Sequence, residues 1–395
     1  MRRLSFVALG FALAVLLAIA STMLDWRPFG SAWQRFRPET PHQRYTRSLA
    51  DAQLVHTALA TDWLMAAARA LRQPTALTVP FTEEALIDPA RPVSLGYAVT
   101  LKRGQKLDVQ VTVVTDLPGQ VFVDLFEPAE GRESTSESTP RPVASAPQDE
   151  AGLSHEALRS GVYLLRVQPE LLRGGHMRIT SAPAASLRFP VSGGGAASIQ
   201  SVYGDERDAG RRSHEGIDIF AARGTPVLAA SDGFVTQVGQ NRLGGNVVWV
   251  WNPARGVRLY YAHLQDQVVR AGSFVYAGDA LGTVGNTGNA KNTAPHLHFG
   301  IYARGDGAID PDPFIRPAAA VPDNPDVAAS ALGEWATTRG RVSLRASPSN
   351  NSPVVETLPA ARPIRIEGVS GPWVRTTSAG QLAFVKARDL RLARD

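Results

Sequence analysis

The chain has 395 residues, a formal net charge of +5 and no cysteine, and 44% of its residues are hydrophobic and 19% charged. This composition is globular, and the length is too great for one ordinary core, so we expect two to four domains. The missing cysteines exclude disulfides, a lipoprotein anchor, thiolate catalysis and cysteine-ligated zinc. The basic residues are scattered, which argues against nucleic acid as a partner. A pI near 9.7 suits either a polyanionic partner, such as a bacterial envelope, or simply a solvated basic surface.

The first 24 residues have the pattern of an export signal. Arg2 and Arg3 precede an uncharged apolar run over residues 4–24, which is long enough for a membrane span of roughly 20 residues. Ala18 and Ala20, with Ile19 between them, also fit a signal-peptide cleavage site. A cleaved signal peptide and an uncleaved membrane anchor both stay open, and both export the rest of the chain. We predict a protein of the periplasm or cell envelope, anchored to the inner membrane if the segment is not cleaved.

Two segments are predicted before the middle of the chain. Residues 41–73 carry apolar side chains at three- and four-residue spacings, which predicts a helical segment that ends before Pro74. Residues 77–191 hold short strands of alternating polarity, so we predict a β-sandwich there. The stretch 161–167 resembles the jelly-roll modules that accompany secreted bacterial peptidases. Residues 130–149, rich in Ser, Thr, Pro and Glu, are expected to form a mobile loop in this domain.

The rest of the chain is also predicted to be mainly β. Residues 197–316 follow a Ser-Gly-Gly-Gly-Ala linker and hold glycine-bounded strands with almost no helical periodicity, which predicts an antiparallel β-sheet domain. A second linker leads to residues 333–395, whose length and short strands resemble small bacterial SH3-like barrels. The predicted fold is therefore mainly β and multidomain. It comprises an N-terminal membrane or signal helix, a β-sandwich, the antiparallel domain and a small SH3-like barrel.

Four of the eight histidines fall within residues 197–316. His296 and His298 alternate along a predicted strand, so they project from one face while Leu297 and Phe299 face the core. His263 ends another predicted strand. Two nearby imidazoles on one face are a natural pair of metal ligands or acid–base groups.

A second short stretch supplies the remaining donors. An extended chain would separate His214 from Asp218 by about 13 Å, so joint ligation of one ion requires a bend at Gly216. Imidazole and carboxylate donors suit a tetrahedral Zn²⁺ with one position open for water. The residues therefore predict a hydrolytic zinc site built from His214, Asp218 and one histidine of the later pair. The other histidine and His263 are left for acid–base work.

Five motifs occur in order across this domain: His-x-x-x-Asp at 214–218, Gly-Thr-Pro-Val at 224–227 with Ala-Ala-Ser-Asp-Gly at 229–233, Tyr-Ala-His-Leu at 261–264, Gly-Asn-Thr-Gly at 285–288 and Pro-His-Leu-His-Phe at 295–299. Together they resemble the lysostaphin-type zinc metallopeptidases that cut peptidoglycan cross-bridges, which have a LytM-like, duplicated-hybrid-motif fold. By this resemblance His214, Asp218 and His298 bind zinc. His263 and His296 flank the scissile carbonyl and the activated water.

Some features of the domain bear on its specificity. Gly300 stands where the family often has an acidic residue, and residues 289–294 lengthen one loop. We expect loops at 252–256 and 286–295 to lie over the groove and set its specificity. Trp249 and Trp251 alternate on a predicted strand. We expect them to pack in the core or at a sheet edge and not to form a sugar-binding platform.

The resemblance implies an exported zinc metalloendopeptidase that hydrolyses the peptide cross-links of bacterial peptidoglycan through a metal-activated water. Its partners would be stem peptides, and envelope proteins are also possible partners. The alternative is a non-catalytic envelope scaffold or an activator of a cell-wall amidase, and the intact ligand set argues against it. The SH3-like domain would either tether the enzyme to the wall or cap the catalytic domain. The upstream segments would either leave the groove open or cover it until they are removed.

Overall fold

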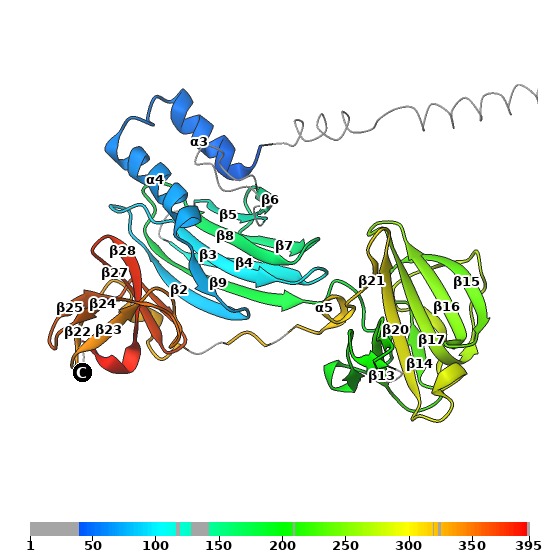
Figure 1. The fold of residues 1–395 in the computed structure, drawn as a ribbon. Helices are drawn as coiled ribbons and strands as arrows, with labels where there is room; N and C mark the ends of the chain where they lie inside the picture. The colour runs from blue at the N-terminus through cyan, green and yellow to red at the C-terminus, as the bar shows by residue number, and fades with distance from the viewer. Residues whose placement is uncertain are drawn as a thin grey trace, which may run out of the picture. The chain divides into compact units, whose positions relative to one another are not determined.

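The computed structural model describes residues 39–115, 119–127, 142–207, 210–318, 320–322 and 325–392 (Figure 1). The predicted signal peptide or anchor at 1–24 lies outside these residues. Within the described part of the chain, no helix combines the length and the apolar character that crossing a membrane requires. The chain divides into two units, Met1–Ala52 and Gln53–Asp395, and each is described by itself.

Two helices occupy the predicted helical segment. In the first unit, α3 (Pro41–Asp51) begins at a capping box in which Thr40 and Gln43 exchange side chain-to-backbone hydrogen bonds. In the second unit, α4 (Ala58–Arg72) is capped by the side chain of Thr57. Gln53 lies between them with a φ of 59°, outside the helical region. The continuous apolar periodicity therefore hides a break in the segment.

Two sheets share one hydrophobic cluster in the region predicted to be a sandwich. One sheet has the order β1-β3-β8-β5-β6, and the other contains β2-β9-β4-β7. Their bounds are β1 (Thr75–Leu77), β2 (Phe81–Ile87), β3 (Leu95–Leu101), β4 (Lys106–Val114), β5 (Val121–Phe126), β6 (Pro142–Ser145), β7 (Gly152–Glu156), β8 (Gly161–Pro169) and β9 (Gly175–Ala184). The similarity to jelly-roll modules stays a prediction.

Part of the predicted mobile loop is a strand. Residues 130–141 lie outside the described residues, but β6 pairs with β5, and Ser145 donates a 2.6 Å hydrogen bond to Asp124. The expectation of a loop up to residue 149 is therefore wrong at β6. A run of small and polar residues hid a short edge strand that depends on its neighbour for its shape.

The C-terminal strands extend a sheet of the sandwich. They are β22 (Trp335–Thr338), β23 (Val342–Arg345), β24 (Val354–Leu358), β25 (Pro363–Arg365), β26 (Gly368–Ser370), β27 (Trp373–Ser378), β28 (Gln381–Lys386) and β29 (Leu390–Leu392). Because β26 pairs with β2, a nine-stranded sheet runs through both regions. The likeness of this tail to an SH3 barrel stays a prediction.

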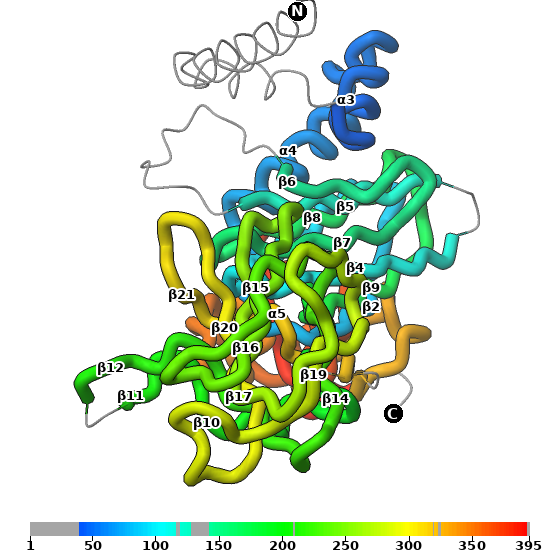
Figure 2. Tube along the Cα trace, turned by 90° about the vertical axis from the view of Figure 1, so that its right-hand side faces the viewer, coloured from blue at the N-terminus to red at the C-terminus, as the bar shows by residue number. Residues whose placement is uncertain are grey.

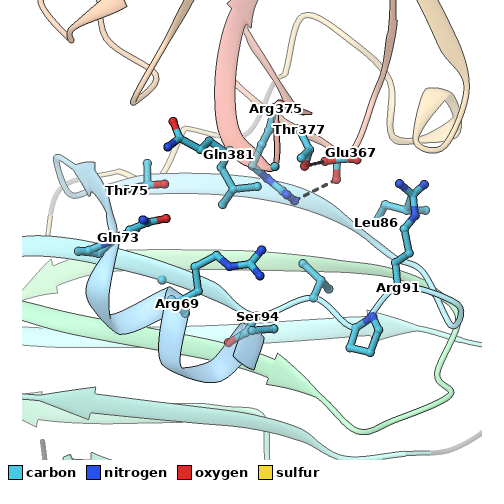
Figure 3. Close-up of a pocket in the computed structure, with 18 of the residues that line it drawn as sticks. Arg69, Gln73, Thr75, Leu86, Arg91, Ser94, Glu367, Arg375, Thr377 and Gln381 are labelled. Carbon is cyan, nitrogen blue, oxygen red and sulfur yellow. Dashed lines mark hydrogen bonds between the residues drawn. The ribbon is translucent and has the colours of Figure 1, made fainter. Parts of the chain in front are cut away.

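A buried ion pair joins the tail to the sandwich. Arg375 lies 2.5 Å from Glu83, and their side chains are only 3% and 2% exposed. Tyr97 donates a further hydrogen bond to Glu83. Figure 3 shows Arg375 beside Glu367 and Thr377 at this junction, where they line a cavity of about 500 Å³. Each charge of the pair is thus compensated inside the protein and not by water.

An antiparallel sheet forms the framework of the third region (Figure 2). Its order is β10-β13-β20-β17-β16-β15-β18, with β14 and β19 paired to one another, β19 also paired to β17, and β21 paired to β20. The bounds are β10 (Ile199–Ser201), β13 (Ile217–Phe220), β14 (Pro226–Leu228), β15 (Gly233–Asn241), β16 (Gly245–Asn252), β17 (Val257–Gln267), β18 (Phe274–Val275), β19 (Ala280–Val284), β20 (His296–Ala303) and β21 (Gly307–Ile309). The predicted mainly-β fold is confirmed.

Short elements complete the described chain. They are the hairpin strands β11 (Glu206–Arg207) and β12 (Arg212–Ser213), helix α5 (Asp312–Ile315), and the 3-10 turns η1 (Ala196–Ser198), η2 (Gly288–Ala290), η3 (Ala329–Ala331) and η4 (Ala387–Asp389). In the main sheet, Leu297, Phe299 and Ile301 are fully buried in the core. The alternate residues of β20 lie on the opposite face, as the sequence predicts.

Replacing Arg375 by Met should lower the free energy of unfolding by about 3–5 kcal/mol, because the carboxylate of Glu83 would stay buried without its partner. The double variant Glu83→Met/Arg375→Met should recover most of this loss. Urea denaturation measures both, with Arg316→Met as the control, because Arg316 belongs to a more exposed pair with Asp312. A double variant that is no more stable than Arg375→Met would contradict this account.

Candidate metal centre

Three predicted ligands meet on the outer face of the main sheet. His214 Nε2 lies 3.1 Å from Asp218 Oδ1 and 3.0 Å from His298 Nδ1. His298 Nδ1 is also 3.0 Å from Asp218 Oδ1. Tetrahedral zinc with bonds of about 2.0–2.2 Å separates its donors by about 3.4 Å. The triangle fits such an ion with little adjustment, and this is the group of described residues that can hold a metal.

Strand pairing places two of these donors. Asp218 of β13 lies directly opposite His298 of β20, and directly opposed residues share one face of a sheet. The chain bends just before β13 begins at Ile217, which returns His214 to the same ion site. The predicted bend at residues 214–218 is confirmed.

Gly216 permits this bend because nothing larger fits. A Cβ atom there would lie 2.5 Å from the carbonyl oxygen of Phe299 and 2.8 Å from Nε2 of His298. The backbone of Gly216 is not in the left-handed region, where glycine is favoured for its freedom. Glycine is therefore required by the close approach of both the Phe299 carbonyl oxygen and the His298 ring.

Hydrogen bonds orient the ligands. His214 Nδ1 lies 2.8 Å from the carbonyl oxygen of Val202, so Nδ1–H donates there and Nε2 faces the donor triangle. Arg207 donates a 2.9 Å hydrogen bond to Oδ2 of Asp218, which leaves Oδ1 for the ion. Burial raises the pKa of Asp218, but its contacts with His214 and His298 outweigh burial and hold the pKa well below its usual range.

His263 projects from an irregular point of β17. Its φ is 62°, a left-handed conformation that is uncommon for a residue other than glycine and is often found at functional sites. Nδ1 lies 2.9 Å from the carbonyl oxygen of Thr287. Burial, together with the neighbouring His296 and His298, lowers the pKa of His263 to about 4. The ring is therefore neutral at pH 7.

His296 is held in a similar way. Its Nδ1 lies 2.9 Å from the carbonyl oxygen of Ala294, and its ring stacks on Phe220 with centroids 4.9 Å apart. Nε2 lies 4.0 Å from Asp218 Oδ1, beside the donor triangle. The His263 and His296 ring centroids are 5.0 Å apart. The structure thus brings together all five residues that the sequence singled out.

A groove of about 830 Å³ runs over these residues. The predicted specificity loop at 286–295 contributes Asn289, Ala290 and Thr293 to its lining. The predicted loop at 252–256 contributes none of the described lining residues, so that expectation is wrong. The loop at 252–256 follows the C-terminal end of β16. The turn at 241–244 precedes its N-terminal end, lies nearer to the histidines and does line the groove.

Aromatic residues form one wall of the groove. Trp249 contacts the rings of Tyr260 and Tyr302, with centroids 4.3 and 5.2 Å apart. All three line the groove. The expectation that Trp249 only packs in the core or at an edge is therefore wrong. Alternation along a strand identifies which residues share a face but not which face is hollowed.

Sequence reasoning missed the basic residues of the site. Arg207 and Arg212 come from the β11–β12 hairpin, and Arg242 comes from the β15–β16 turn. Their signal is weak because arginine is scattered along the chain, and only the folded hairpin brings Arg207 to Asp218. Its place a few residues before the first histidine motif is the one hint that the sequence offers.

The sequence matches a known family over the segment that builds this site. Residues 212–311 match the model of peptidase family M23. The chain therefore contains a peptidase family M23 domain, and the recognised resemblance to lysostaphin-type enzymes is confirmed.

The chain is similar to several named proteins over part of its length. The chain is 37% identical over 130 residues to the L-Ala--D-Glu endopeptidase of Bacillus subtilis, covering 30% of this chain and 40% of the relative. It is 38% identical over 109 residues to lysostaphin of Staphylococcus simulans, covering 27% of this chain and 22% of the relative. A solved lysostaphin catalytic domain from S. simulans is 36% identical, covers 29% of this chain and 87% of that one, and has a TM-score of 0.27. The chain thus spans less than half the length of these curated relatives.

The Gly216→Ala variant should weaken Zn²⁺ binding by about 10- to 100-fold, because its Cβ would clash with the Phe299 carbonyl oxygen and the His298 ring and so displace His298 from the donor triangle. Competition with a chelating dye measures the affinity. Gly239→Ala is the matched control, because a Cβ there meets nothing within 4 Å. Equal affinities for the two variants would show that this close approach does not position His298.

Proposed function

We propose that the chain is an exported zinc-dependent endopeptidase that hydrolyses peptide cross-links of bacterial peptidoglycan. The observation that carries the proposal is the donor triangle of His214, Asp218 and His298, set in a groove beside two further histidines. The M23 match over residues 212–311 supports hydrolysis of a peptide bond. A relative from Vibrio cholerae named peptidoglycan DD-endopeptidase, 37% identical over 94 residues, supports a peptidoglycan substrate.

We assign the metal-ligand role to His214 Nε2, Asp218 Oδ1 and His298 Nδ1. A zinc ion held there would activate a water molecule and polarise the carbonyl of the scissile peptide. Arg207 and the carbonyl of Val202 would keep Asp218 Oδ1 and His214 Nε2 turned toward the ion. Each does so by binding the other polar atom of the same side chain, which faces away from the ion. Zn²⁺ is the proposed cofactor, since two imidazoles and one carboxylate form a ligand set it commonly takes in hydrolases.

The remaining two histidines would move protons. His263 and His296 each donate Nδ1–H to a backbone carbonyl, which fixes the tautomer and presents Nε2 to the groove. A neutral Nε2 can accept a proton from the attacking water and return it to the leaving amine. Their rings lie beside one another, so both can reach a peptide bound at the donor triangle.

Other parts of the proposal concern the whole chain. We propose that the domains span residues 77–191, 197–316 and 333–395. We also propose that the protein is localised in the periplasm or cell envelope, because residues 1–24 have the pattern of an export signal. The scaffold or amidase-activator alternative is not favoured, because a protein that only binds a partner has no use for a complete donor triangle with two flanking imidazoles.

Replacing each histidine in turn should distinguish loss of catalysis from loss of bound zinc. His296→Ala and His263→Ala should lower kcat by about 10²- to 10⁴-fold and keep Zn²⁺ bound, because they remove proton-transfer groups. His214→Ala should lose both activity and metal. Mass spectrometry of products from cross-linked muropeptides measures activity, and metal analysis measures zinc. If wild-type protein with zinc releases no cleaved peptides, the proposed function is wrong.

Chelation tests the metal requirement directly. Treatment with 1,10-phenanthroline should abolish muropeptide cleavage, and added Zn²⁺ should restore it, because the donors bind the ion reversibly. The non-chelating isomer 1,7-phenanthroline is the control for effects of the aromatic compound itself. If protein that contains no zinc by metal analysis still cleaves muropeptides, zinc has no role in the reaction.

A further inference from the structure

The outer face of the main sheet carries a row of residues that continues beyond the groove. Tyr302 of β20 lies opposite Arg258 of β17, and Arg258 lies opposite Trp251 of β16. Trp251 in turn lies opposite Phe234 of β15, which is opposite Phe274 of β18. Directly opposed residues share one face. Figure 2 shows β15, β16, β17 and β20 side by side.

One end of this row reaches the metal centre. Tyr302 contacts Trp249, and Trp249 contacts Tyr260, with ring centroids 5.2 and 4.3 Å apart. The ring of Tyr260 meets that of His298 at 5.8 Å. Trp249 and Trp251 lie two residues apart on the same face of β16. Aromatic side chains thus connect a proposed zinc ligand to the start of the exposed row.

The far end of the row is open to solvent. Phe234 and Phe274 pack edge to face with centroids 5.0 Å apart, and Phe274 packs on Tyr276 at 5.2 Å. These three side chains are 48%, 45% and 65% exposed. A neighbouring residue of the same strand, Val235, is 1% exposed in the core. Three large aromatic residues that contact one another and remain in water mark an interaction surface.

The length and chemistry of the row limit what can occupy it. Adjacent strands lie about 4.8 Å apart, so the row extends about 19 Å from β20 to β18. Its aromatic members offer flat apolar faces, while Arg258 interrupts them with hydrogen-bond donors. A chain of pyranose rings matches this pattern, because each ring has an apolar C–H face and a polar edge. A lipid surface would favour an apolar patch that no charged residue interrupts.

We propose that this row, Trp251, Phe234, Phe274 and Tyr276 with Arg258, binds the glycan strand of peptidoglycan. The inference rests on the proposed function, since the peptide in the groove would be attached to that glycan. Continuity of the row with the groove supports it: a stem peptide at the donor triangle can remain joined to sugars that lie across β16, β15 and β18. The row would then align long, insoluble substrate with the peptidase site.

Binding to peptide-free glycan strands tests the row independently of hydrolysis. The metal-free full chain should bind these strands, and the double variant Phe234→Ala/Phe274→Ala should weaken the Kd about tenfold or more. Tyr276→Ala, at a more exposed position, should weaken binding in the same direction without a packing defect. Trp335→Ala is the matched control, because Trp335 is 59% exposed on β22, outside this sheet. Circular dichroism confirms folding of each variant.

Hydrolysis supplies a second readout. The double variant should raise KM for intact sacculi about tenfold and leave kcat/KM for a sugar-free cross-linked peptide unchanged. Loss of glycan binding in these variants supports the glycan-binding role of the row, whether or not the wild-type protein cleaves peptides. Absence of cleavage by the wild-type protein would contradict only the proposed function. Wild-type protein that cleaves peptides but binds no glycan overturns the row. Equal binding by wild type and the double variant, or binding to phosphatidylglycerol vesicles in place of glycan, also overturns it.

Discussion

The site depends on one strand pairing, that of β13 with β20. Ile217 and Ile219 face the core together with Leu297 and Phe299, and all four side chains are fully buried. This burial fixes the register, because a slip by one residue would turn Asp218 into the core and the isoleucines into water. The same register sets Asp218 opposite His298. Packing energy on one face of the sheet therefore positions the chemistry on the other.

Much of this arrangement is readable from the sequence. Alternation over residues 296–299 predicts which histidines share a face, and joint ligation of one ion by His214 and Asp218 requires the bend between them. The first inference needs only local geometry, and the second also needs the shared ion. The mainly-β character of the chain follows in the same way, from short runs of alternating polarity bounded by glycine. The residues of the donor triangle are the ones the motifs singled out, and their ligand roles stay a proposal.

The features that escaped prediction depend on contacts between distant residues. Arg207 reaches Asp218 only because a two-stranded hairpin folds over the site. The loop at 252–256 follows the end of β16 that is far from the histidines, and only the direction of that strand in the folded sheet keeps the loop out of the groove lining. Trp249 lies on the wall of the groove, and the alternation of residues along its strand does not show which face of the sheet is hollowed. Composition and spacing describe a strand well, but they do not say what covers it.

The buried ion pair of Glu83 and Arg375 constrains how the sequence of this protein can evolve. Loss of the tail would remove the ion-pair partner of Glu83 and uncover the edge of β2. Both changes would destabilise the sandwich. The tail is therefore expected to be inherited together with the sandwich and not exchanged as an independent module.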